Sequence, residues 1–162
     1  MHVRIATVDD APAILDIYNH EVLTSTVTFD LVPRTIAEQL AWMTDRSGAH
    51  VVVVAVDDNG FVVGFGALSA YRERAGYATT VEDSVYVHEA HRGAGVGRLL
   101  LSDLVDRATA HGFHALMAKI VGHHEASIHL HESAGFEIVG REREVGRKFG
   151  RWLDVVLLER LL

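Results

Sequence analysis

The sequence predicts an α+β fold built around one mixed sheet, within a single domain that spans residues 1–162. Three observations favour this class. Apolar runs of strand length, such as His50–Val56 and Phe61–Ala70, are joined by Asp57-Asp58-Asn59-Gly60, a sequence typical of hairpin turns. Segments with apolar residues at helical spacing stand between the strands. The chain of 162 residues is long enough for one core and short for two domains.

Two capping-box patterns mark the first expected helix starts, Thr7 with Asp10 and Thr35 with Glu38. In this pattern the side chains at the two positions satisfy each other's free backbone N–H groups. The first box follows a predicted strand at 2–7 and opens a helix to about residue 22. The second predicts another helix before the hairpin.

The second half of the chain begins with a long expected strand, Tyr77–His88. The glycine-rich stretch Arg92–Gly97 then opens a helix that ends near Gly112. The remaining expected elements are a strand at 114–121, a helix at 125–133 that Gly135 terminates, and closing strands at 136–145 and 152–161.

Composition excludes several classes of protein. A net charge of −7 argues against a general nucleic-acid binder, because few basic residues are free to neutralise phosphates. The absence of cysteine excludes a disulfide framework, a thiolate nucleophile and a sulfur-ligated zinc site. The longest interior apolar run, Val51–Val56, is far below the roughly 20 residues of a membrane span. The N-terminus lacks the pattern of a secretory signal, so we expect a cytoplasmic protein without membrane partners.

The glycine-rich stretch has the features of a phosphate-binding loop. Glycines allow successive backbone N–H groups to face one concavity, and a helix N-terminus adds partial positive charge there. No Gly-Lys-Ser/Thr follows, which excludes a nucleoside-triphosphate P-loop. The alternate spacing of Gly93, Gly95 and Gly97 also departs from the dinucleotide fingerprint.

The loop, read as Arg92-x-x-Gly95-x-Gly97 after a strand that ends in Val-Tyr-Val, resembles the coenzyme A loop of the GCN5-related N-acetyltransferase (GNAT) superfamily. The resemblance covers essentially the whole chain. It is strongest to the phosphinothricin and methionine sulfoximine N-acetyltransferases, through five ordered segments: Tyr18–His20, Ser25–Phe29, Val81–Val87, Leu130–Phe136 and Lys148–Asp154. It implies a GNAT fold with a mostly antiparallel sheet of about seven strands and about four flanking helices.

The resemblance implies acetyl-CoA as cosubstrate and assigns its contacts. The pantetheine arm falls to the backbone of Val85, Tyr86 and Val87, which would also supply an oxyanion donor. The pyrophosphate falls to the loop that consists of Arg92, Gly93, Ala94, Gly95, Val96, Gly97 and Arg98. His124 and Ser127 lie beside it on the following helix, although His124 stands where the superfamily often has an asparagine.

Glu82 and His131 are the expected catalytic residues. Strand alternation places Glu82, Ser84 and Tyr86 on one face, and a carboxylate in a buriable strand is a candidate base for the ammonium proton. His131 occupies the position where many superfamily members have a tyrosine beside the leaving thiolate. It could serve as an acid or as a second base.

The expected substrate is a small amine with a carboxylate. Arg72 matches the subgroup's carboxylate-binding arginine, and Glu73 and Arg74 stand beside it. Phe29, Lys148 and Arg151 are expected to help enclose the pocket, either of their own chain or of the neighbouring subunit in a homodimer.

Other interpretations remain open. No His-Glu-x-x-His motif is present, so we expect no metal. The same fold could acetylate another amine, such as a protein N-terminus or a polyamine. A coenzyme A-binding module without catalysis is a third interpretation, and the presence of both Glu82 and His131 counts against it.

Overall fold

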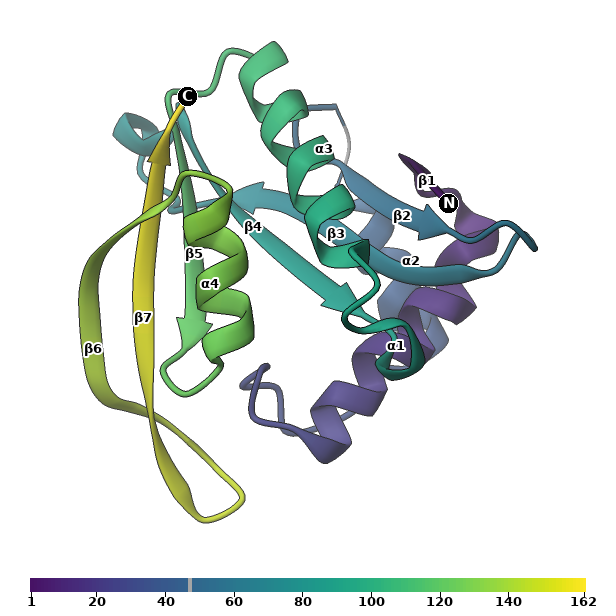
Figure 1. Cartoon of the computed structure of the whole chain (residues 1–162), viewed down its shortest axis with the longest axis horizontal. Coiled ribbons are helices and arrows are strands. Elements are labelled where there is room, and N and C mark those ends of the chain that lie inside the picture. The colour runs from purple at the N-terminus through teal and green to yellow at the C-terminus, as the bar shows by residue number, and fades with distance from the viewer. Residues whose placement is uncertain (47) are drawn as a thin grey trace.

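The computed structural model describes residues 1–46 and 48–162 (Figure 1). Within these residues, seven strands form one mixed sheet in the order β1-β2-β3-β4-β5-β7-β6. Their bounds are β1 His2–Ile5, β2 Val52–Val56, β3 Val62–Ala70, β4 Thr80–Val87, β5 Ala115–Val121, β6 Glu137–Lys148 and β7 Arg151–Leu161. All neighbouring strands pair antiparallel except β4 and β5, which are parallel. This arrangement confirms the predicted mixed, mostly antiparallel sheet.

Helices cover both faces of the sheet in Figure 1. Helix α3, Val96–Ala110, packs on β3 and β4 and contacts α4, Glu125–Ser133. The other face is covered by α1, Ala11–Thr24, against which α2, Ile36–Thr44, packs. Short 3₁₀ turns stand at Val8–Asp10, Ala75–Tyr77 and Glu89–His91.

Local hydrogen bonds and backbone geometry explain why the predicted helix starts and the predicted hairpin turn form. The hydroxyl of Thr35 accepts from the Glu38 N–H at 3.2 Å, and the Glu38 carboxylate accepts from the Thr35 N–H at 2.7 Å. The Asp10 carboxylate likewise accepts from the Thr7 N–H at 2.7 Å. In the β2–β3 hairpin, Gly60 has φ of 87°, a conformation that glycine adopts without strain.

Two strand boundaries differ from the prediction by three residues, and the others by at most two. Strand β4 begins at Thr80 and not at Tyr77, because the Tyr77 N–H bonds to the Arg74 carbonyl at 2.9 Å and closes a 3₁₀ turn. Strand β6 continues to Lys148, beyond the expected 145. It does so because β7 pairs with it along the whole hairpin, although two register shifts interrupt the ladder.

The sheet separates two apolar layers. Leu100 and Leu104 of α3 are fully buried against one face, together with Val81 of β4. On the other face, the rings of Phe65 and Tyr86 stack with centroids 5.1 Å apart beneath α1. Val81 and Tyr86 therefore lie on opposite faces of β4, as the predicted alternation requires.

The parallel pair β4–β5 opens the sheet. These strands are in register only from Thr80 with Ala115 to Glu82 with Met117, and β4 then continues to Val87 without a partner on that side. In Figure 1 the two strands diverge towards the glycine loop and the start of α4. The divergence exposes one edge of β4 inside the molecule, and the candidate site forms there.

Candidate active site

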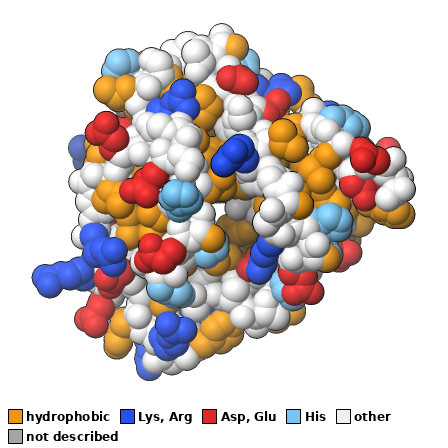
Figure 2. All heavy atoms as spheres, viewed as in Figure 1, with side chains coloured by type: hydrophobic (Ala, Val, Ile, Leu, Met, Phe, Trp, Pro, Cys, Tyr) orange, Lys and Arg blue, Asp and Glu red, His pale blue; other side chains and the backbone are white. Residues whose placement is uncertain are grey.

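A cavity of about 1170 Å³ lies between the diverging strands. Its walls come from β4, β5, the start of α3, α4 and the segment after α1. The space-filling view shows the molecule hollowed near its centre, with cationic and histidine side chains around the opening (Figure 2). Such a volume is at or above the upper end of typical small-molecule sites, so it suits a large ligand.

The free edge of β4 faces this cavity. The His88 N–H bonds to the Val63 carbonyl of β3 at 3.0 Å, so even-numbered residues direct their backbone groups towards β3. Residues 83, 85 and 87 then direct theirs towards the opening. The Val87 carbonyl accordingly accepts from Arg92 Nε at 3.4 Å. An extended chain with amide groups could pair with the free backbone groups of Val85 and the free N–H of Val87, as a peptide adds to a sheet edge.

The glycine loop provides backbone donors at the other end of the cavity. Gly93 and Gly95 have φ of 77° and 84°, and Gly95 is the N-cap of α3. No atom lies within 4 Å of a Cβ built on either residue, so both glycines leave open space beside the helix start. The first N–H groups of α3 have no partner within the helix. The open space beside these glycines and the free N–H groups at the start of α3 fit a diphosphate.

Arg92 has a partner that the sequence did not reveal. Its guanidinium donates to the carboxylate of Glu21 on α1, which is buried and also accepts from Ser25 Oγ at 2.7 Å. The signal was a glutamate beside the apolar Val22, on a helix face expected to be buried. A phosphate that binds Arg92 must therefore share its guanidinium with Glu21 or break the Arg92–Glu21 ion pair.

Glu82 lies on the cavity wall and forms an ion pair with Lys119 of β5 at 2.9 Å. Lys119 Nζ also lies 5.3 Å from the centroid of the Tyr71 ring. Lys119 was not predicted as a site residue. Its signal was one charged residue in the otherwise apolar strand Ala115–Val121.

His131 forms a buried pair with Asp83. His131 Nε2 lies 3.0 Å from Asp83 Oδ2, and His131 Nδ1 lies 2.7 Å from the Ser127 carbonyl oxygen. Burial lowers the pKa of His131, but the hydrogen bond and charge of Asp83, with the Ser127 carbonyl, outweigh burial and raise this pKa above its ordinary value. Asp83 was missed, although an acid between Val81 and Val85 on an apolar strand face was a visible anomaly.

The start of α4 brings His124 and Ser127 to the cavity, where the resemblance led us to expect them. Burial lowers the pKa of His124, and the positive charge of Arg92 lowers it further. The neighbouring His123 lies 2.9 Å by its Nε2 from Thr26 Oγ1, which joins the segment after α1 to the start of α4 across the cavity. A neutral His124 is an uncharged partner for an amide.

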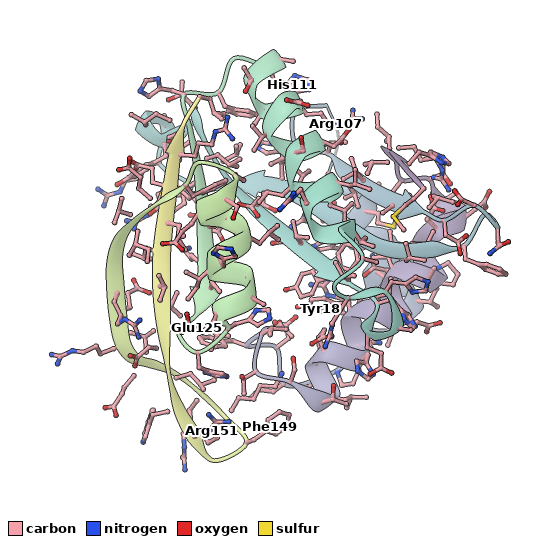
Figure 3. All side chains as sticks on the ribbon, viewed as in Figure 1. Tyr18, Arg107, His111, Glu125, Phe149 and Arg151 are labelled. Carbon is pink, nitrogen blue, oxygen red and sulfur yellow. The ribbon has the colours of Figure 1, made fainter. Side chains whose placement is uncertain are left out.

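Arg72 lines the cavity next to Tyr71. Its guanidinium donates to the Tyr71 hydroxyl at 3.2 Å and lies 4.9 Å and 5.3 Å from the ring centroids of Tyr71 and Tyr77. These contacts hold an exposed cation in a defined place. Phe29 and Arg151 also line the cavity, and Figure 3 places Arg151 beside Phe149 at the β6–β7 hairpin.

Four of the predicted residues do not line the cavity, namely Glu73, Arg74, Ala94 and Lys148. Lys148 is buried and its ammonium donates to the Thr28 carbonyl at 2.9 Å, so it supports the segment that carries Phe29. All the other predicted catalytic, cofactor and substrate residues do line it.

The described residues, 1–46 and 48–162, also bear on metal-binding and membrane proteins. No group of three His, Asp or Glu side chains among them is arranged to hold a metal ion. No helix in this part of the chain is both long enough and apolar enough to cross a bilayer.

Comparisons with known proteins agree with this geometry. Residues 3–157 match the family model described as "Acetyltransferase (GNAT) domain". The L-methionine sulfoximine/L-methionine sulfone acetyltransferase of Salmonella typhimurium is 40% identical over 159 residues, which cover 98% of this chain and 93% of that protein.

Two solved structures have nearly the same fold. The phosphinothricin acetyltransferase of Sinorhizobium meliloti in complex with AcCoA has a TM-score of 0.96 at 40% identity, covering 99% of this chain and 87% of that one. The ribosomal-protein-alanine N-acetyltransferase of Brucella melitensis has a TM-score of 0.97 at 36% identity, with complete coverage of both chains. A glycine loop at a helix start, a free strand edge and this similarity across almost the whole sequence place the chain in the GNAT family of acetyltransferases.

Proposed function

We propose that this chain transfers an acetyl group from acetyl-CoA to the primary amine of a small amino-acid-like substrate, of the methionine sulfoximine, methionine sulfone or phosphinothricin type. The observation that carries the proposal is that the glycine loop, the free β4 edge, Glu82 and Arg72 all open into one cavity. In this proposal residues 1–162 form a single acetyltransferase domain.

The cosubstrate supplies an activated acetyl thioester, and the chain supplies its position. The N–H groups that follow Gly95 hold the diphosphate, with Arg92 and Arg98 as charged partners. Backbone groups of Val85 and Val87 pair with the pantetheine arm and leave one N–H for the developing oxyanion. Binding at two separated points aligns the thioester along β4.

Glu82 accepts a proton from the substrate ammonium, directly or through one water molecule. The ammonium is attracted to this carboxylate, while Arg72, held against Tyr71, binds the substrate carboxylate. Lys119 must yield part of its contact with Glu82 when the ammonium arrives. This makes Lys119 a residue that orients the base in the free enzyme.

Removing the Lys119 charge tests that role. We expect Lys119→Met to lower kcat/KM for the amine about two- to fivefold, because a half-exposed ion pair is worth about 0.5–1 kcal/mol. Lys119→Arg keeps the charge and should stay near wild type. Steady-state thiol release measures both variants. Equal loss in the two variants would show that shape, and not charge, matters at this position.

A protein N-terminus is the second candidate acceptor, favoured by the similarity to the Brucella melitensis enzyme. Thiol release from acetyl-CoA decides between the two. We expect methionine sulfone, methionine sulfoximine or phosphinothricin to exceed the common amino acids, and peptides with free N-termini to be poor acceptors. A peptide as the best acceptor would favour the second candidate. If none of these amines led to thiol release, both candidates would be contradicted.

The proposal includes a homodimer and the cytoplasm as its place of action. The β6–β7 hairpin exposes Val145, Phe149 and Trp152, with exposed fractions of 57%, 57% and 61%. Apolar side chains gathered beside a ligand cavity are typical of an interface. The compartment follows from the donor, since acetyl-CoA is an intracellular metabolite. Light scattering at several concentrations measures the oligomeric state.

A further inference from the structure

Both ring nitrogens of His131 are occupied by acceptors. A carbonyl oxygen can only accept, so the contact of Nδ1 with the Ser127 carbonyl requires a proton on Nδ1. An ionised Asp83 can also only accept, and its Oδ2 faces Nε2 at 3.0 Å. A neutral imidazole would place the Nε2 lone pair against the carboxylate. The favoured state has protons on both nitrogens beside an ionised Asp83.

Burial makes this state depend on the pair itself. The side chains of His131 and Asp83 are 4% and 2% exposed. Asp83 Oδ1 has no hydrogen-bond partner in the described part of the chain. The contact of Oδ2 with His131 Nε2 is therefore the principal interaction that compensates for burying the Asp83 carboxylate. The edge of the Phe136 ring packs against the imidazole, with centroids 5.0 Å apart.

Few other charges bear on His131. His124 lies on the same helix, and burial lowers its pKa, which favours its neutral form. Glu82 and Lys119 line the cavity as an ion pair and largely offset each other. Arg160 of β7 donates to the Ala134 carbonyl at the end of α4. Asp83 is therefore the carboxylate in direct contact with His131.

We propose that Asp83 is a positioning residue that keeps His131 doubly protonated, so that His131 is the proton donor to the leaving thiolate and not a second base. This inference rests on the proposed acetyl transfer. It selects between the two roles that the sequence leaves open for His131, and it adds a residue with no role in the sequence-based assignment.

The proton balance is complete. The amine nitrogen forms the new bond to the acetyl carbon after Glu82 has taken one ammonium proton, and the carbon–sulfur bond breaks with its electron pair on sulfur. His131 Nε2 gives its proton to that sulfur. The amide nitrogen releases its remaining extra proton to solvent, and Glu82 releases the proton that it took from the ammonium. The Asp83–His131 pair regains one proton from solvent. One proton is released overall.

An NMR titration of His131 in the ligand-free protein tests the proposal without any turnover. The His131→Gln variant assigns the signal. We expect a wild-type midpoint above the ordinary value of about 6.5. We expect Asp83→Asn to lower it by about one unit or more, because the opposite charge is lost while burial remains. Asp16→Asn, an exposed change of the same kind on α1, should leave the midpoint unchanged.

Kinetics supply the second readout. We expect Asp83→Asn to lower kcat about tenfold at pH 8 and less at pH 6, with the KM for acetyl-CoA nearly unchanged. A midpoint that Asp83→Asn does not move, or a wild-type ring that is neutral at pH 6.5, would overturn the proposal. If Asp83→Asn does not fold, the wild-type titration decides alone. Absence of wild-type thiol release would contradict the proposed function and leave the titration result standing.

Discussion

Glu82→Gln is expected to lower kcat for acetyl transfer about a hundredfold, because a positioned general base contributes about 10²–10⁴-fold to such reactions. The substitution keeps the shape of the side chain at the mouth between β4 and β5. It removes the only function that the proposed mechanism asks of Glu82, the acceptance of a proton from the ammonium. Lys119 is 41% exposed and can turn to solvent, so we expect little loss of stability.

Coenzyme A affinity separates this effect from misfolding. Calorimetry should give the same dissociation constant for Glu82→Gln and wild type, since the glycine loop lies at the other end of the cavity. Glu125→Gln is the matched control, because Glu125 is an exposed residue at the start of α4 and is not part of the lining (Figure 3). Turnover of Glu82→Gln within a factor of two of wild type would remove Glu82 from the mechanism.

Gly95→Ala is expected to weaken coenzyme A binding about 10- to 100-fold. The loss corresponds to about one charge-assisted hydrogen bond between a backbone N–H group and phosphate, worth about 1.5–3 kcal/mol. At φ of 84°, alanine also strains the backbone by about 1–2 kcal/mol. The added methyl group meets no protein atom within 4 Å, so it projects into the space assigned to the ligand.

Gly112→Ala distinguishes strain from binding. Gly112 follows the C-terminal end of α3 with φ of 82°, and its Cβ would also meet nothing within 4 Å. The two variants should therefore lose similar stability in denaturant titrations, while Gly95→Ala alone loses coenzyme A affinity in calorimetry. Equal affinities in the two variants would contradict a diphosphate at the start of α3.

Features that depend on neighbouring residues were predicted correctly. The capping box at Thr35, the turn at Gly60 and the helix at 125–133 are determined by side chains within a few positions of one another. The alternation that sets Glu82 apart from Val81 is equally local. Of the two strand boundaries misplaced by three residues, the end of β6 depends on pairing along the β6–β7 ladder. The start of β4 follows a local 3₁₀ turn that the strand pattern did not indicate.

The sequence alone therefore determined the kinds of chemistry available: a glycine loop for phosphate, an acid on β4 and a histidine on α4. Only the tertiary structure decided their partners. Asp83 meets His131 across 48 positions of sequence, and Glu82 meets Lys119, because β4 and β5 pair for three residues and then separate. The physical reason is that a parallel crossover brings together residues with no local interaction, so the charge state of each group is set by a neighbour that no spacing rule identifies.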